Sequence, residues 1–124
     1  MKSREAALRS KRFDLTEKGR KVASMEAMVA DFEHMASDLM RQITAEEERT
    51  GVRDSGHFAY STFAKAARLR RSNLLNSVED LKVKLDAARH EHAATAAELS
   101  RLEPPALRDS DRSLVKVDRL VLIG

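Results

Sequence analysis

The residues best suited to metal binding or proton transfer are the histidines, and their spacing does not favour either role. They are His34, His57, His90 and His92. On a helix, His90 and His92 point about 200° apart, whereas Asp86 and His90 share a face. Two ligands are too few for a zinc site. The pattern favours solvated histidines, with His92 as a polar residue in a helical seam, and we expect no metal and no cofactor.

The acidic run Glu46–Glu48, followed by Asp54, lacks the alternating oxygen ligands of a calcium loop. It is better interpreted as a solvated acidic face opposite Lys65 and Arg68. The glycines nearby form neither a dinucleotide-binding nor a phosphate-binding loop motif. Serine, histidine and aspartate all occur, but no scaffold brings them together, so we predict no enzymatic activity.

Within the first hundred residues, helix-breaking residues gather in a single stretch, TGVRDSGHFAY at 50–60. Gly51, Asp54, Ser55 and Gly56 fall within six positions of one another. Glycine, aspartate and serine are typical of turns. The chain is therefore predicted to fold back on itself near Ser55.

The segment before this turn, about 3–49, is predicted to be one long helix. Its apolar residues recur at the a and d positions of a heptad, the pattern of a coiled coil. The predicted core residues are Leu15, Val22, Met25, Val29, Phe32, Leu39 and Ile43. Lys11, Lys18 and Glu46 occupy the same stripe, so the seam is weaker near its ends.

The segment after the turn, about 61–103, repeats the heptad pattern and is the second predicted helix. Its predicted core residues are Leu74, Val78, Leu81, Leu85 and Leu99, with Arg71 and His92 as polar members of the stripe. Pro104 and Pro105 end the helix, because neither has a backbone N–H and Pro104 disfavours helical geometry at Glu103.

The two stripes fit together in antiparallel register, and the charges agree. The register pairs Val29 with Leu81 and Phe32 with Val78, and it also pairs Leu8 with Leu102. Residues 22–48 carry seven acids and one base, and residues 49–71 carry six bases and one acid. The predicted fold class is therefore all-α, two long helices in an antiparallel coiled-coil hairpin over 1–103. Residues 104–124 are expected to be a linker and a poorly ordered tail, with a strand, a loose helix or a docking segment left open.

Composition agrees with this class. Charged residues make up 35% of the 124 residues and aromatic residues 4%, and there is no cysteine. Such values suit long helices and argue against a thick core with aromatic anchors. The charged N-terminus has no apolar run of signal-peptide length, and no segment has the roughly 20 apolar residues of a membrane span. We expect a cytoplasmic protein without direct membrane insertion.

Nucleic-acid binding is the alternative suggested by charge. Lys65, Arg68, Arg70 and Arg71 cluster in the second helix. An acidic block is expected to neutralise them, Arg71 lies on the seam, and interleaved aromatic residues for base stacking are missing. We therefore predict no nucleic-acid partner.

Three aromatic residues, Phe58, Tyr60 and Phe63, lie together at the turn. One interpretation is a hydrophobic plug that closes the tip of the hairpin. The other is an exposed patch that docks a partner.

The sequence resembles the flagellar export protein family FliJ, in its alphaproteobacterial form, over about residues 1–103. The resemblance rests on the start MKSREAALRSKRF, on EKGRKVASMEAMVADFEHMASDL, and on HFAYSTFAKAARLRRSNLL after the turn. An aromatic HFAY tip followed by TFAKAA is not generic heptad sequence. Residues after Pro105 match nothing expected of the family.

The resemblance implies a non-enzymatic stalk or adaptor of the flagellar type III export apparatus, peripheral to the cytoplasmic membrane at the flagellar base. By likeness to rotary-ATPase stalks, Met1–Lys21 and Ala88–Glu103 would enter the pore of the hexameric export ATPase. The rest of the hairpin would meet the export gate protein FlhA, and export chaperones are a further candidate partner. Residues 1–21 carry eight bases against three acids. From exposure and composition, the candidate partner-binding residues are the three turn aromatics together with Arg4, Arg9, Lys11, Arg12 and Lys18. The alternative is a generic coiled-coil module that self-associates or binds nucleic acid.

Overall fold

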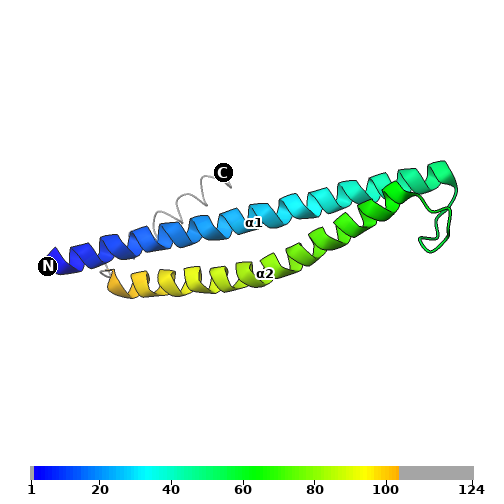
Figure 1. Ribbon diagram of the computed structural model, residues 1–124. Helices are drawn as coiled ribbons and strands as arrows, with labels where there is room; N and C mark the ends of the chain where they lie inside the picture. The colour runs from blue at the N-terminus through cyan, green and yellow to red at the C-terminus, as the bar shows by residue number, and fades with distance from the viewer. Residues whose placement is uncertain (1, 104–124) are drawn as a thin grey trace, which may run out of the picture. The chain divides into compact units, whose positions relative to one another are not determined.

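The protein is an antiparallel coiled-coil hairpin of two long helices. The computed structural model describes residues 2–103, and the predicted linker and tail at 104–124 lie outside this range. Helix α1 runs over Lys2–Thr50 and helix α2 over Thr62–Leu102, joined by residues 51–61 (Figure 1). Each of the four helix ends lies within one residue of the position expected from the sequence.

The length of the helices follows from what they lack and from how they end. Helix α2 contains neither proline nor glycine, and α1 contains Gly19 alone. At the start of α2 the Ser61 hydroxyl accepts a hydrogen bond from the Ala64 N–H at 3.2 Å, the usual N-cap arrangement. Arg49 and Arg101 lie in the last turns, where a positive charge interacts favourably with the helix dipole.

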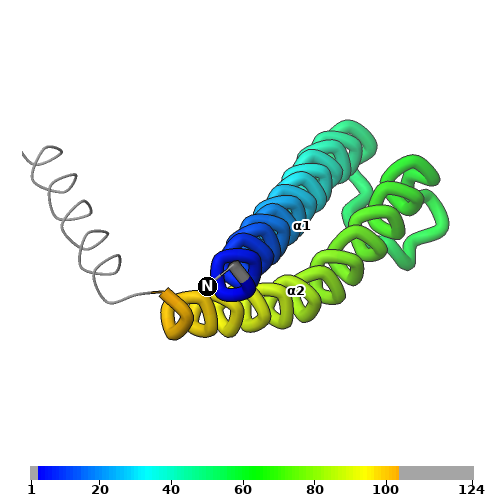
Figure 2. Tube along the Cα trace, turned by 90° about the vertical axis from the view of Figure 1, so that its left-hand side faces the viewer, coloured from blue at the N-terminus to red at the C-terminus, as the bar shows by residue number. Residues whose placement is uncertain are grey.

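The described chain divides into two units, which are considered separately. The first contains residues 2–20 of α1, residues 89–102 of α2 and Glu103, and the second contains residues 21–88. In each unit the two helices lie beside each other in antiparallel directions, as both views show (Figures 1 and 2).

The second unit has an aliphatic seam arranged in two clusters. Val29, Val78 and Leu85 form the first, with Val22, Met25, Phe32 and Leu81 packed against it. Leu39, Ile43 and Ala67 form the second, with Leu74 packed against it. Every core residue predicted for this unit belongs to one of the two clusters. The register is the expected one, since residues 22–32 meet residues 78–85.

The first unit has a mixed seam. Leu8 and Leu99 are buried and Leu15 is half-buried, but Thr95 is the least exposed residue described in this unit, at 2%. Leu102, which the predicted register places opposite Leu8, stays 37% exposed. Leu102 is the last residue of α2, so no further helical turn covers it.

Neither α1 nor α2 combines the length and apolar character needed to cross a membrane; only residues 2–103 enter this finding.

Candidate functional site

The candidate site begins with the loop at 51–61, where backbone hydrogen bonds replace those of the helices. Gly51 has a φ of 75°, a left-handed conformation that glycine adopts without steric cost, and its N–H reaches the Glu47 carbonyl at 2.9 Å. The Asp54 carboxylate accepts the Gly56 N–H at 2.9 Å, which forms an Asx turn. His57 Nδ1 accepts the Ala59 N–H at 3.0 Å. The loop is thus held by local turns.

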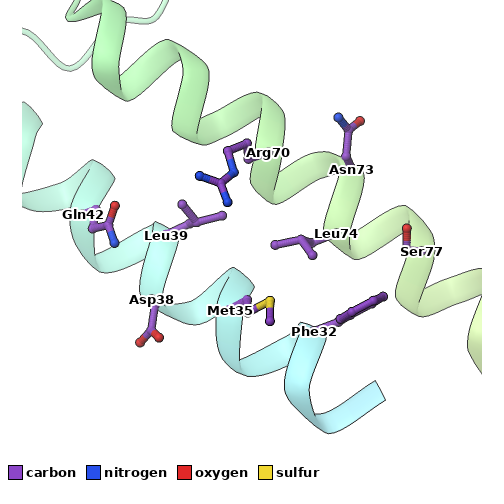
Figure 3. A pocket seen from close by; sticks show the side chains of 9 residues that line it. All are labelled: Phe32, Met35, Asp38, Leu39, Gln42, Arg70, Asn73, Leu74 and Ser77. Atoms are coloured by element: carbon purple, nitrogen blue, oxygen red, sulfur yellow. The ribbon is translucent and has the colours of Figure 1, made fainter. Parts of the chain in front are cut away.

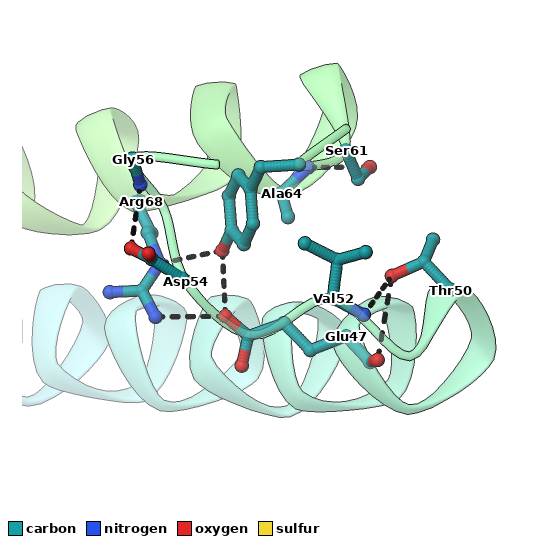
Figure 4. A network of polar contacts seen from close by, with 9 residues as sticks. Glu47, Thr50, Val52, Asp54, Gly56, Ser61, Ala64 and Arg68 are labelled. Atoms are coloured by element: carbon teal, nitrogen blue, oxygen red, sulfur yellow. Dashed lines mark hydrogen bonds and ion pairs between the residues drawn. The ribbon is translucent and has the colours of Figure 1, made fainter. Parts of the chain in front are cut away.

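A hydrogen-bonded network of three side chains, Glu47, Tyr60 and Arg68, fastens this loop to both helices. The Tyr60 hydroxyl donates to Glu47 Oε2 at 2.7 Å and accepts from Arg68 Nε at 2.7 Å. A second guanidinium nitrogen of Arg68 donates to Glu47 Oε2 at 2.9 Å. Figure 4 shows Glu47 and Arg68 pointing toward each other from the two helices. We call these three residues the tip clasp.

The electrostatics of the tip clasp favour its charged form. The hydrogen bond from Arg68, and after it the one from Tyr60, lowers the pKa of Glu47 below its usual value. The hydrogen bonds that Arg68 makes to Glu47 and, after it, to Tyr60 raise the pKa of Arg68. Glu47 itself is buried, so its carboxylate depends on these partners.

The tip clasp corrects the interpretation of the acidic run as a solvated face. Glu47 is buried, and it faces Arg68 as expected, but Lys65 is exposed and takes no part. Glu46 instead pairs with Arg49 one turn along α1, and this contact lowers the pKa of Glu46. The network itself was missed. A feature of the sequence that could have predicted this network is Tyr60, which lies just before the second helix, together with Glu47 near the end of the first helix and Arg68 near the start of the second.

The three turn aromatics have different surroundings. Tyr60 is 8% exposed, so it closes the tip and does not form part of an exposed docking patch; the hypothesis that it contacts a partner is corrected accordingly. Phe58 is 96% exposed and stacks on His57 with ring centroids 4.6 Å apart. Phe63 is 54% exposed. Tyr60 therefore fits the plug that closes the tip, whereas Phe58 and Phe63 stay exposed to solvent.

A shallow groove of about 470 Å³ runs along one side of the second unit. Figure 3 shows Leu39 and Leu74 pointing toward each other at its floor, with Arg70 beside them. Phe32 and Met35 supply further apolar wall, and Met35 is exposed. The groove offers an apolar surface near the tip.

The basic residues proposed for partner contact lie in the first unit, and four of the five are engaged by that unit. Arg4 donates to the Leu102 carbonyl at 3.1 Å, Lys11 pairs with Glu98, and Arg12 lies 3.8 Å from Glu103. Lys18 donates to the Thr95 hydroxyl at 2.8 Å and lies 3.2 Å from Asp14. The exception is Arg9, which is exposed and makes no hydrogen bond or ion pair within residues 2–103.

The two lysines in the seam of the first unit, Lys11 and Lys18, contact polar residues adjacent in α2 to, or one turn from, the residues expected opposite them. The register predicted Lys11 opposite Leu99 and Lys18 opposite His92. Each lysine instead extends to a neighbouring polar group, Glu98 or Thr95, because an ammonium group at an apolar seam is stabilised by an oxygen acceptor. The contact between Lys11 and Glu98 raises the pKa of the lysine and lowers that of the acid.

Within residues 2–103, no group of three or more histidine, cysteine, aspartate or glutamate side chains has an arrangement that could hold a metal ion. Asp86 and His90 are both exposed. His92 is half-buried and packs over Gly19, where an added Cβ would lie 3.3 Å from its Nε2.

The four bases of α2 do not form a common surface either. Arg71 is half-buried, and Lys65, Arg68 and Arg70 are exposed, but Arg68 is paired with Glu47 in the tip clasp. A phosphate backbone requires several cations that face solvent together. This arrangement gives the nucleic-acid alternative little support.

Comparison with known proteins adds no further constraint: no family model, no curated protein and no solved structure matches this chain significantly.

Proposed function

We propose that this protein is a non-enzymatic stalk or adaptor of a flagellar type III export apparatus, which couples the export ATPase to the membrane export gate and assists export of flagellar proteins. It would work in the cytoplasm, at the membrane-proximal base of the flagellum. The proposal rests on the resemblance to the FliJ family and on the surfaces of the hairpin.

The observation that supports the proposal most is the presentation of Phe58. This phenylalanine is 96% exposed on a loop that the tip clasp fastens to both helices. An exposed aromatic side chain on an ordered loop is typical of an anchor that a partner covers. Phe63, also exposed, adds apolar area close in sequence. We assign this tip to the export gate.

The first unit supplies the second contact surface. Its lysines and arginines remain partly exposed even where they pair with α2, and Arg9 is free within the described residues. A basic surface attracts acidic loops and accelerates association. By the resemblance, this unit would enter the ring of the export ATPase.

ATP turnover by a purified hexameric export ATPase tests the assignment of the first unit. The full chain should stimulate turnover, and Arg9→Glu should reduce the stimulation, because it reverses an unpaired surface charge. Lys84→Glu, an equal charge change at an exposed residue of the second unit, is the matched control. Equal stimulation by both variants would contradict the assignment of the first unit to the ATPase. If the unmodified chain does not stimulate turnover, the proposed stalk role is wrong.

Binding to the cytoplasmic domain of the export gate tests the assignment of the tip. Phe58→Ser should weaken binding strongly and leave the helical circular dichroism unchanged, because Phe58 contributes almost nothing to the fold. Leu69→Ser, another exposed apolar residue at 64%, is the control and should bind normally. Unchanged binding of the Phe58 variant rules out the tip as the docking surface.

Self-association is the alternative that a specific observation favours. Met28 and Met35 are exposed on α1, and Met35 lines the groove shown in Figure 3. Sedimentation of the full chain separates the two functions. A stable dimer that Met35→Lys dissociates favours the generic coiled-coil module, and a monomer favours the adaptor.

A further inference from the structure

Arg71 is the one described side chain that buries a polar nitrogen or oxygen without a hydrogen-bond partner. Its Nε is shielded from solvent, and no acceptor within residues 2–103 lies in range. The arginine forms no ion pair there either. A buried N–H without an acceptor destabilises a fold, and more so when the group is charged.

The neighbouring arginine shows what Arg71 lacks. Arg68, almost one helical turn earlier, donates to both Glu47 and Tyr60. Glu47 is therefore already occupied by Arg68 and Tyr60. Within residues 2–103, Arg68 therefore has a buried carboxylate as its partner, and Arg71 has none.

Arg71 lines a groove of about 360 Å³ that differs from the one in Figure 3. The groove combines hydrogen-bonding groups with an apolar wall. Its residues are Arg68, Arg71, Ser72 and Asn76 on the polar side and Met40, Ile43 and Leu75 on the apolar side. We call it the Arg71 groove.

These residues select for a particular ligand chemistry. A guanidinium binds a planar carboxylate through two parallel N–H donors, and the Ser72 hydroxyl and Asn76 amide can add further donors. Met40 and Leu75 suit an aliphatic group next to that carboxylate. Because Glu47 neutralises Arg68, the groove has the charge of about one free arginine, which suits one carboxylate better than a polyanion.

We propose that the Arg71 groove binds an acidic peptide, through one aspartate or glutamate carboxylate held by Arg71 beside an apolar residue seated on Met40 and Leu75. The site does not depend on the export role proposed above. The carboxylate binds the two terminal guanidinium nitrogens of Arg71, because the Nε itself is shielded from solvent.

Nuclear magnetic resonance of the full chain, labelled with ¹⁵N at arginine, tests this directly. The Arg71 Nε–H signal is assigned by its absence in Arg71→Lys. Titration with a blocked Leu-Glu-Leu tripeptide should shift the signal saturably, whereas Leu-Gln-Leu should bind at least about tenfold more weakly because it lacks the charged acceptor. The absence of a saturable shift with the glutamate peptide overturns the proposal.

Inorganic phosphate at matched ionic strength distinguishes a peptide site from a general anion site. Phosphate should shift the Arg71 signal less than the glutamate peptide does at equal concentration. An equal or larger response overturns the acidic-peptide assignment. Arg70→Gln is the matched control, because Arg70 lines the other groove and should leave peptide binding unchanged.

A second variant keeps the test independent of folding defects. Arg71→Met removes the unsatisfied N–H and keeps an unbranched side chain at an inward position. It should raise the midpoint of thermal unfolding and abolish the peptide response. A lowered midpoint would mean that the hairpin itself stabilises the arginine, and the proposal would then be wrong.

Discussion

The seams of the two units differ in the chemistry of their side chains. In the second unit the helices meet through aliphatic side chains, and Ile43 and Val78 are almost fully enclosed. In the first unit a threonine is enclosed, two lysines reach across to polar groups, and His92 lies over Gly19. One heptad pattern therefore gives two kinds of interface.

The difference indicates where the stability of the hairpin resides. Apolar burial contributes in proportion to the area removed from water, and salt does not screen it as it screens ion pairs. Partly exposed ion pairs contribute little, because solvent and salt screen them. We infer that the second unit contributes most of the stability of the hairpin, and that the helices of the first unit separate more readily.

The largest effect is expected in the aliphatic seam. Ile43→Ala should lower the free energy of unfolding by about 2–4 kcal/mol, because it removes buried methyl groups and leaves a cavity. Urea denaturation followed by circular dichroism measures the loss. Val83→Ala, at an exposed position of the same unit, should change stability by less than about 0.5 kcal/mol. Equal losses for the two variants would contradict the burial pattern.

A smaller loss is expected at the tip clasp. Tyr60→Phe keeps the ring and removes the hydroxyl that joins Glu47 to Arg68, so it should cost about 1–2 kcal/mol. The same denaturation experiment applies. A variant as stable as the unmodified chain would show that the hydroxyl contributes nothing and that the ring alone closes the tip.

Protonation removes the same network by another route. The pKa of Glu47 is lower in the folded chain than its ordinary value of 4.5, so the folded state gains stability from the carboxylate above that value. This gain should be lost as the pH falls from 4.5 through the lower, folded-state pKa. The unmodified chain should have a higher midpoint of thermal unfolding than Glu47→Gln. This difference should be largest at pH 7 and should decrease as the pH is lowered. A constant gap would contradict the assignment.

A still smaller effect is expected where Gly19 meets His92. Alanine is favoured over glycine in a helix by about 1 kcal/mol. The new Cβ would lie 3.3 Å from His92 Nε2, so the imidazole has to shift and offsets part of this gain. Gly19→Ala should therefore stabilise the hairpin more in a His92→Ala background than alone. Identical gains in the two backgrounds would show that the histidine moves freely.

The smallest effect is expected for the exposed pair in the first unit. Glu98→Gln removes the partner of Lys11 and should lower the thermal midpoint slightly at low salt. The difference should disappear near 1 M salt, where screening acts over about 3 Å. A loss comparable to that of Ile43→Ala would overturn the contrast between the two seams.

Local sequence signals were enough for much of the fold. The heptad stripe, the cluster of helix breakers around Ser55 and Pro104 each act over a few residues, so the helices and the register could be predicted. The aromatic tip was also visible as a candidate site. What could not be predicted was which tip residue turns inward, since Phe58 and Tyr60 are alike in the sequence and opposite in exposure.

The sequence by itself determined an antiparallel helical hairpin, because periodic apolar residues and helix breakers specify helices and a turn wherever the chain is placed. Only the tertiary structure decided that Glu47 is enclosed in preference to Glu46 and that Tyr60 fastens the tip. It also decided that the Arg71 Nε has no acceptor among residues 2–103. Those outcomes depend on how side chains from opposite helices meet near the turn. Heptad positions specify which face of a helix is buried, and they do not specify the partner of each polar atom.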